Sequence, residues 1–389
     1  MHRRSSTTRP GVPLLVARIA GIAGIAAIAG ALLAACAPAP VARTTPAAGP
    51  GTYANPVFDA DFPDPTVVRA DDGLYYAYAT QSVVPRADGT GADSLNVQVL
   101  RSADLVHWTR AGDALPVRPA WARRTRDFWA PHVSVHAGRY YLYYSARPDT
   151  ALRDTTQGLC LAVATATRPT GPFADSGRPL QCGPTFVNID PMQFDDPRTG
   201  TPLLYWGSGF GPVKVQPLAP DRLTFAPGSR PTPLVDVERT ADTTRYQRLV
   251  EGAWVTYEAP WYYLFYSGDN CCGPRAHYAV MVARSRAATG PFETLADATG
   301  RPQSVILARS AAWNAPGHNS IVRDASGGLW MAYHAVDVRR PGGPPAEQVN
   351  TRRVMLLDRV TFRDGWPMLR DGQPSSGPQI APLVDRRAP

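Results

Sequence analysis

Three carboxylates lie in apolar stretches of the sequence, where acids are uncommon. Asp64 stands in "DFPDPTVV", Asp190 in "PTFVNIDPMQF" and Glu251 in "VEGAWV". A single Asp-Pro pair is most simply a turn. If the fold brings these three acids into one partly dry pocket, they cannot all ionise independently. The pKa of at least one of the three carboxyls must then rise. One carboxylate can then act as a base while another holds a proton, as glycoside hydrolysis requires.

These acids belong to a pattern that recurs five times along the chain. Its clearest part is an aromatic-rich segment with alternating bulky residues, found at 74–80, 139–145, 202–208, 261–267 and 329–335. A short apolar segment precedes each of these, and another strand-like run follows. The repeated unit is therefore three or four antiparallel strands within about sixty residues.

Five such sheets bury both faces if they are stacked radially, which predicts an all-β, five-bladed β-propeller over residues 54–389. A many-stranded β-sandwich is the alternative, but it would not require so regular a period. In a propeller, the first strand of each blade lines the axis. The repeat then places five residues at matching points around one end of that axis: Asp64, Trp129, Asp190, Glu251 and His318.

Residues 1–35 are typical of an export signal, with a basic start, a long run of small apolar residues and the ending "LAAC" at Cys36. This ending resembles a bacterial lipoprotein box, with Cys36 lipidated as the new amino terminus. The alternative is an uncleaved membrane anchor. Residues 36–53 predict a flexible tether. We therefore expect an exported protein that is held to the cell envelope only by its lipid.

Composition and charge argue against a nucleic-acid-binding function and favour a globular protein. The formal net charge is +8, and removal of the leader arginines lowers it. The remaining basic residues are scattered and form neither a block nor a basic helix, which argues against nucleic acid as a partner. With 44% hydrophobic residues, the chain can bury a large core.

Six stretches taken together resemble glycoside hydrolase family 43, and most closely its arabinan-degrading members. In chain order they are "NPVFDADFPDPTVVRADDGLYYAYAT", "FWAPHV", "NIDPMQFDD", "VEGAWV", "YYLFYSGDNCCG" and "APGHNSI". The likeness runs from about Asn55 to Pro367. It implies an inverting mechanism with Asp64 as the general base and Glu251 as the general acid. Asp190 then orients the acid and raises its pKa.

The resemblance also implies binding roles for other residues. His318 looks like the axial histidine beside a bound calcium ion, with waters supplying most ligands. Arg353 resembles the arginine that reaches the sugar beside the orienting carboxylate, although an ordinary surface ion pair is the alternative. Trp129 is placed to stack on a sugar face. The chain departs from the family at His132, where an acid is usual, and at Ala253, where proline is frequent.

For the substrate, the sequence favours arabinan or arabino-oligosaccharides from plant cell walls, cleaved by a monomeric enzyme. Xylan-acting relatives often carry a further carboxy-terminal β-sandwich, for which we expect no room here. The alternatives are an exo-acting β-xylosidase on xylo-oligosaccharides and a surface glycan-binding propeller without activity. The non-catalytic alternative predicts loss of one of the three acids, and all three are present.

Four cysteines follow Cys36, and export permits disulfides. Cys160 is expected on the third strand of the second blade. The turn segment "TRPTGPF" between it and Cys182 could bring the two thiols together across antiparallel strands. The neighbours Cys271 and Cys272 could bond to each other at the rim of the cleft. Four free thiols are the alternative. The absence of a CxxC pair argues against a structural zinc site.

Overall fold

The computed structural model describes residues 51–86, 88–149, 157–342 and 351–384. The predicted leader, Cys36 and almost all of the tether lie outside the described residues. No helix in these ranges is long and apolar enough to cross a bilayer. All of the described residues belong to one compact unit.

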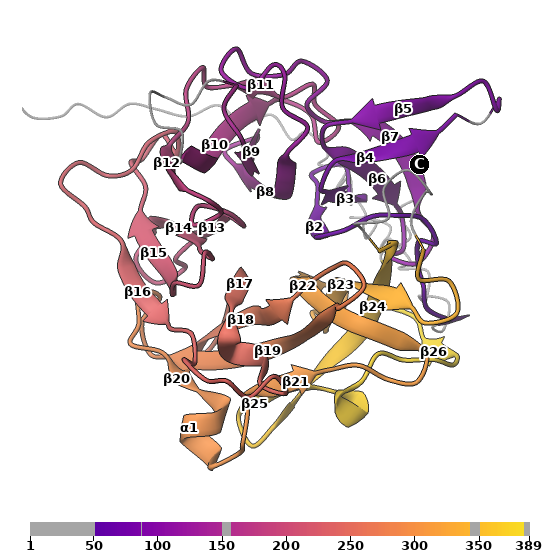
Figure 1. The fold of residues 1–389 in the computed structure, drawn as a ribbon, viewed down its shortest axis with the longest axis vertical. Helices are drawn as coiled ribbons and strands as arrows, with labels where there is room; N and C mark the ends of the chain where they lie inside the picture. The colour runs from indigo at the N-terminus through magenta and orange to yellow at the C-terminus, as the bar shows by residue number, and fades with distance from the viewer. Residues whose placement is uncertain (1–50, 87, 150–156, 343–350, 385–389) are drawn as a thin grey trace, which may run out of the picture. The chain divides into compact units, whose positions relative to one another are not determined.

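Five antiparallel sheets, each with a path of four strands in chain order, confirm the predicted all-β, five-bladed propeller (Figure 1). Blade 1 contains β2 (Thr66–Arg69), β3 (Tyr75–Ala79), β6 (Gln98–Ser102) and β7 (Thr109–Asp113). Blade 2 contains β8 (Phe128–His136), β9 (Arg139–Ala146), β10 (Gln157–Ala166) and β11 (Ala174–Asp175), with β12 (Gln181–Pro184) also paired to β10. Blade 3 contains β13 (Met192–Asp195), β14 (Pro202–Trp206), β15 (Val213–Pro217) and β16 (Thr232–Val235).

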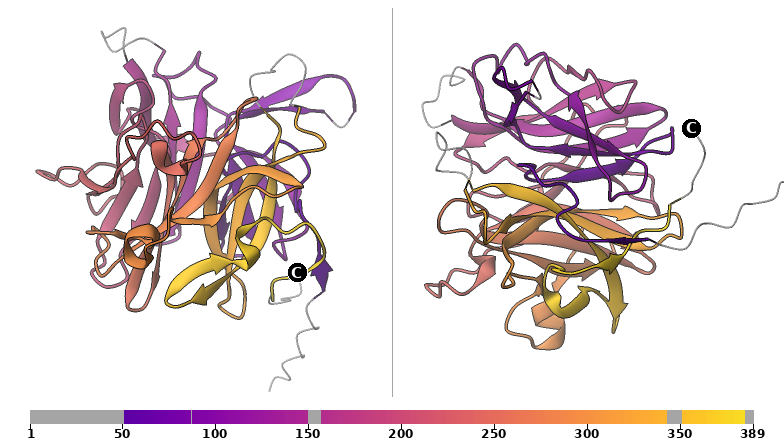
Figure 2. Two further views of the ribbon diagram at one scale, coloured as in Figure 1. Left: turned by 60° about the horizontal axis from the view of Figure 1, so that its bottom comes forward. Right: turned by 90° about the vertical axis from the view of Figure 1, so that its right-hand side faces the viewer.

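Blade 4 contains β17 (Val250–Glu258), β18 (Trp261–Asn270), β19 (His277–Ser285) and β20 (Glu293–Thr294), with β21 (Val305–Leu307) also paired to β19. Blade 5 contains β22 (Trp313–Arg323), β23 (Leu329–Asp337), β24 (Arg353–Arg363) and β25 (Trp366–Leu369). The first strands of successive blades are neighbours, and β22 of blade 5 in turn contacts β2 of blade 1, so the ring closes. The side views in Figure 2 show the twist of the sheets.

The second strand of each blade is the aromatic-rich segment of the repeat, and it is buried almost throughout. All five residues of β3 and all nine of β23 are buried. A strand inside a sheet that is covered on both faces reads as a near-continuous apolar run, because neither face meets water. This is why the segments "LYYAYAT" and "LWMAYHA" lack the alternation of polar and apolar residues seen in half-exposed strands.

Short elements outside the blades close and decorate the ring. The first and last described strands meet, because β1 (Thr52–Tyr53) pairs with β26 (Gln379–Ile380), and Phe58 bridges to Met355 of β24. The hairpin of β4 (Ser82–Pro85) and β5 (Ala92–Leu95) is inserted between β3 and β6 and extends away from its blade (Figure 1). The described helical turns are η1 (Tyr246–Arg248), α1 (Leu295–Thr299) and η3 (Arg370–Gly372).

Candidate active site

One residue near the start of each first strand has a left-handed backbone. The φ angles are 58° at Asp64, 45° at Ala130, 58° at Asp190, 60° at Gly252 and 48° at His318. Such angles strain a residue that carries a side chain, although Asp tolerates them better than most. Strained backbone concentrates at functional sites. All five blades therefore repeat the same local bend at the same end of the axis.

This bend refines the alignment made from the sequence. The register of the first two strands makes Ala130 and Gly252 the equivalents of Asp64. Trp129 and Glu251 each lie one residue earlier. The bulges that follow these two residues accommodate the difference. Sequence spacing alone does not reveal a one-residue offset between bent strands.

The bent residues are held in place by the preceding blade. Each of four backbone N–H groups donates to a polar side chain there: Ala130 to Thr80 Oγ1 at 2.8 Å, Gly252 to Asp190 Oδ2 at 2.9 Å, His318 to Ser267 Oγ at 2.8 Å, and Asp64 to His334 Nδ1 at 3.1 Å. Thr80 directly follows β3, and Ser267 and His334 lie in the second halves of β18 and β23, the second strands of their blades. The ring thus fixes the carboxylates from blade to blade.

Asp64 is buried but remains ionised. Thr80 donates its hydroxyl to Oδ2 at 2.5 Å, and Arg353 Nη1 donates to Oδ1 at 3.0 Å. Burial acts to raise the pKa of Asp64. The positive charge of the Arg353 guanidinium outweighs burial and holds this pKa well below its usual range. A carboxylate in this state can accept a proton from water over the whole physiological range.

Glu251 has the opposite character. Tyr278 donates its hydroxyl to Oε1 at 2.8 Å, and Ser208 donates to Oε2 at 3.2 Å. Burial raises the pKa of Glu251 to about 7, the negative charge of Asp64 adds to the rise, and the two hydrogen bonds oppose it. Near neutral pH this carboxyl therefore holds a proton that it can donate.

Asp190 interacts electrostatically with both of these carboxyls. Burial raises its pKa well above the usual range, and the charges of Glu251 and Asp64 raise it further. Its Oδ2 accepts the N–H of Gly252, the residue next to Glu251. Since like charges this close cannot all ionise, Asp190 and Glu251 together retain at least one proton near neutral pH. The structure thus brings together the three acids that the sequence singled out.

Comparison with known proteins agrees with this arrangement. Residues 53–367 match the family described as glycosyl hydrolases family 43. The chain belongs to this family. It is therefore a glycoside hydrolase, which confirms the predicted enzyme class and rules against a different fold for the repeat.

Individual relatives give the same result. The chain is 25% identical over 319 residues to an extracellular endo-α-(1→5)-L-arabinanase of Bacillus subtilis, covering 78% of this chain and 86% of the relative. It is 26% identical over 329 residues to an extracellular exo-α-(1→5)-L-arabinofuranosidase of Cellvibrio japonicus, covering 79% and 86%. The solved structure of a thermostable family-43 glycoside hydrolase superposes with a TM-score of 0.66 at 26% identity, covering 86% of this chain and 100% of that one.

Arg353 of this family 43 hydrolase is buried, which rules out the surface ion pair considered from its sequence. The sequence places it beside the orienting carboxylate, whereas in the structure its guanidinium pairs with the proposed base Asp64. Arg353 opens β24 and Asp64 precedes β2, so blades 5 and 1 each contribute one partner. The pairing keeps Asp64 charged. The predicted role of Arg353 in sugar binding stays a prediction.

Trp129 is half-buried on β8, next to Ala130, whose N–H binds Thr80. The stacking of Trp129 on a sugar ring stays a prediction. His132, which replaces the acid usual in the family, is buried, and its ring packs against Trp254 with centroids 5.2 Å apart. Burial lowers the pKa of His132 to about 3, so this position is neutral.

His318 faces two of the acids. Its Nδ1 lies 3.4 Å from Asp64 Oδ1 and 3.9 Å from Asp190 Oδ2. Burial lowers the pKa of His318 despite the neighbouring charge of Asp64. In the described part of the chain, no three His, Cys, Asp or Glu residues are grouped as metal ligands. A calcium ion at the axis would thus depend on waters for most of its ligands, and it stays a proposal from the family likeness.

The cysteine pairs lie where disulfides can form. Cys160 of β10 and Cys182 of β12 are direct partners in the antiparallel register, with a sulfur–sulfur distance of 2.01 Å. Cys271 and Cys272 follow β18 and are bonded to each other in the structure. This turn leaves the end of blade 4 that carries Glu251, because Glu251 pairs with Ser267 near the end of β18.

Tyr278 and His334 are two site residues that sequence reasoning missed. Tyr278 donates to the acid, His334 accepts from the backbone of the base, and their rings stack with centroids 5.8 Å apart and planes inclined by 3°. Burial lowers the pKa of His334 to about 4, so it is neutral. The sequence did contain one signal for such supporting residues, because each aromatic segment ends near a small or polar residue. Several of these residues form hydrogen bonds with residues of the site.

The pH dependence of hydrolysis follows from these two pKa shifts. A general acid works only when protonated, so kcat should fall as pH rises through about 7, the pKa of Glu251. Asp64 stays ionised throughout this range, so no matching fall is expected between pH 7 and the ordinary range of carboxyl pKa values. Removing the hydrogen bond that lowers the pKa of Glu251, by Tyr278→Phe, should move the alkaline limb to higher pH.

Tyr266→Phe is the matched control for this pH profile. Tyr266 is also buried in blade 4, but its hydroxyl donates to Gln247 at 3.0 Å and not to a site carboxyl. Its profile should follow that of the unaltered enzyme. An unmoved limb in Tyr278→Phe, or an equal shift in both variants, would contradict the assignment of the limb to Glu251.

Proposed function

We propose that this protein is an exported, inverting glycoside hydrolase that cleaves α-L-arabinofuranosidic bonds in arabinan or arabino-oligosaccharides. The observation that carries the proposal is the contrast between two buried carboxyls at one end of the axis. Asp64 is held ionised while Glu251 holds a proton near neutral pH. The names of the two curated relatives support arabinan as the substrate and the cell exterior as the location.

The reaction uses both carboxyls in one step. Asp64 takes a proton from a water molecule as its oxygen attacks the anomeric carbon. The bond from that carbon to the glycosidic oxygen breaks, and the oxygen receives the proton of Glu251. Asp64 is then neutral and Glu251 charged, and exchange with solvent restores both. Asp190 holds the N–H of Gly252, the residue after Glu251, and in this proposal it orients the acid.

Stereochemistry tests the mechanism directly. Asp64 and Glu251 belong to blades 1 and 4, which are separated by blade 5 in the ring. An inverting enzyme needs its carboxyls roughly 6.5–9.5 Å apart, so that water fits between one of them and the sugar. We expect the first-formed arabinose unit to be the β-anomer when hydrolysis is followed by NMR of the anomeric proton. Net retention would contradict the assignment of Asp64 as a base toward water.

Product analysis on debranched arabinan, linear xylan and aryl glycosides decides the substrate. Release of arabinose or arabino-oligosaccharides from arabinan supports the proposal, and the size of the products separates exo from endo action. Activity confined to xylan fragments would favour the β-xylosidase alternative. We further propose a monomer anchored by lipid on Cys36, which rests on the "LAAC" motif and on a ring completed within one chain.

A further inference from the structure

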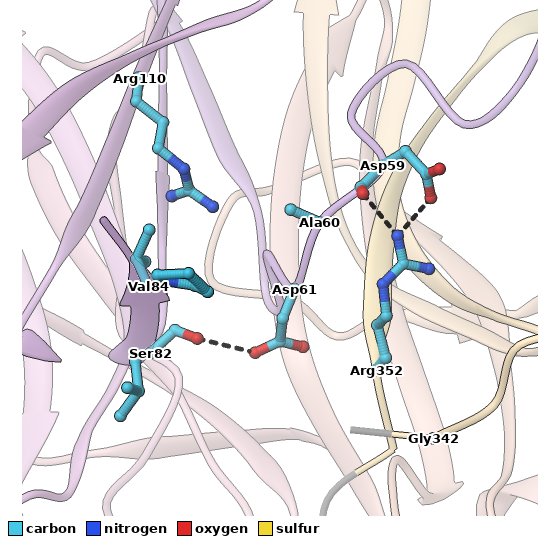
Figure 3. Close-up of a pocket in the computed structure, with 10 residues that line it drawn as sticks. Asp59, Ala60, Asp61, Ser82, Val84, Arg110, Gly342 and Arg352 are labelled. Carbon is cyan, nitrogen blue, oxygen red and sulfur yellow. Dashed lines mark hydrogen bonds and ion pairs between the residues drawn. The ribbon is translucent and has the colours of Figure 1, made fainter. Parts of the chain in front are cut away.

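A pocket of about 360 Å³ lies at the seam between blades 1 and 5 (Figure 3). This volume falls within the range of sites that hold small ligands. Its walls come from the segment before β2, from hairpin strand β4, from β7 and from the residues before β24; they are Asp59, Ala60, Asp61, Ser82, Val83, Val84, Pro85, Arg110, Gly342 and Arg352.

The pocket is connected to Asp64, the general base of the active site, through Arg353. The Oδ1 atom of Asp61 accepts the N–H of Arg353 at 3.0 Å, and the guanidinium of Arg353 binds Asp64. Asp61 and Asp64 are separated along the chain by on the order of 10 Å even when fully extended. A ligand group in the pocket could therefore belong to the same oligosaccharide that is cleaved at Asp64.

Both acids of the pocket already have partners. Asp59 pairs with Arg340 and Arg352, and these arginines hold its pKa below the usual value against the effect of burial. Asp61 accepts from Arg353 through one oxygen and from the hydroxyl of Ser82, at 3.0 Å, through the other (Figure 3). Neither carboxylate has an oxygen left without a donor.

Arg110 is the arginine of the pocket lining that pairs with neither of these two acids. Its Nη1 donates to the amide oxygen of Gln98 at 3.1 Å, and its guanidinium lies 5.0 Å from the ring centroid of Phe58. Within the described ranges no carboxylate forms an ion pair with it, although Asp61 acts on it electrostatically. The side chain is solvent-accessible and keeps its charge. Its fork can therefore receive a carboxylate through two parallel hydrogen bonds.

The part of the pocket lining next to Arg110 is apolar and comes from an insertion (Figure 3). Val83, Val84 and Pro85 lie on the β4–β5 hairpin, which is a separate two-stranded sheet outside blade 1. Val83 remains 37% exposed. The hairpin is tied by Arg86, which donates through Nε and Nη2 to Asp93. Ordered loops that a scaffold does not need for closure are frequent carriers of binding residues.

We propose that this pocket binds a carboxylate-bearing sugar, a uronic acid unit linked near the cleaved bond, with Arg110 as the specificity-determining residue. The sugar ring would lie on the apolar hairpin wall while its carboxylate meets Arg110. The inference rests on the proposed function, because it assumes a saccharide that extends from Asp64. It adds a preference for acidic side groups, which hydrolysis of neutral arabinan does not require.

The test measures binding of D-galacturonic and D-glucuronic acid to the full chain by calorimetry, with their neutral methyl esters as controls. The acids should bind and the esters should bind far more weakly. Arg110→Gln should weaken binding of the acids by about ten- to a hundredfold, the range for loss of a charged hydrogen bond. Arg101→Gln is the matched control, since Arg101 is exposed on neighbouring β6 and does not line the pocket.

Hydrolysis of neutral arabino-oligosaccharides is measured beside binding and should be unchanged in both variants. Equal binding of acid and ester, undiminished binding by Arg110→Gln, or equally tight binding of acetate would each overturn the uronate assignment. If uronates bind through Arg110 but arabinan is not cleaved, the proposed function fails while the pocket assignment stands. The two failures are therefore distinguishable.

Discussion

Replacing Asp64 with alanine is expected to abolish hydrolysis of arabinan, with a loss of about 10²- to 10⁴-fold or more in kcat. Asp64 is the carboxylate that Arg353 and Thr80 hold ionised, so it supplies the proton acceptor for the attacking water. The loss should be as large on an activated aryl arabinofuranoside, because a better leaving group does not make water more nucleophilic. Steady-state rates on both substrates measure it.

Two further variants separate chemistry from folding in this experiment. Alanine leaves the buried Arg353 without its partner, which by itself destabilises a protein. Asp64→Asn keeps a similar shape, tolerates the left-handed φ of 58° and retains an oxygen that can accept from Arg353, so it should be equally inactive but lower the melting temperature less than alanine does. Asp71→Ala, in the exposed turn between β2 and β3, should keep full activity. A folded Asp64→Asn enzyme with substantial activity would remove Asp64 from its role.

Replacing Glu251 with alanine is expected to give a loss that depends on the substrate. On arabinan the leaving oxygen is a poor leaving group and needs the proton of Glu251, so the loss should again be about 10²- to 10⁴-fold. On an aryl arabinofuranoside with an acidic phenol the same variant should retain much more of its rate. Comparing kcat on the two substrates for each variant yields the contrast directly.

The contrast between the two variants assigns the roles. If Glu251→Ala loses equally on natural and activated substrates while Asp64→Ala is spared on the activated one, base and acid are reversed. Glu251→Gln is the conservative companion, because it preserves the bonds from Tyr278 and Ser208 in shape but cannot donate the same proton. It should also lose the fall of kcat with pH near 7, since the titrating group is gone.

Much of the architecture could be predicted from the sequence. The aromatic segments and the turns between them are local signals, and each blade is formed from strands of one contiguous stretch of the chain. A repeat of local units therefore predicts the propeller. The three acids were also recognisable, because carboxylates in apolar strands are rare unless they serve a function.

Details of the site depended on the strand bends. The sequence alignment treats Trp129 and Glu251 as equivalents of Asp64, whereas the backbone makes Ala130 and Gly252 the equivalent residues. A bulge adds a residue on one strand without changing the pattern of residue types. Spacing could thus place the acids around one end of the axis but could not determine which residue carries the bend.

The sequence by itself determined the five-fold repeat, the identity of the three acids and the family. Only the tertiary structure decided which acid is charged. Arg353, which keeps Asp64 ionised, lies 289 positions away along the chain, and Tyr278 reaches Glu251 from another strand. A pKa depends on burial and on charges within a few ångströms, whatever their separation in sequence. Those distances exist only once blade 5 has closed against blade 1.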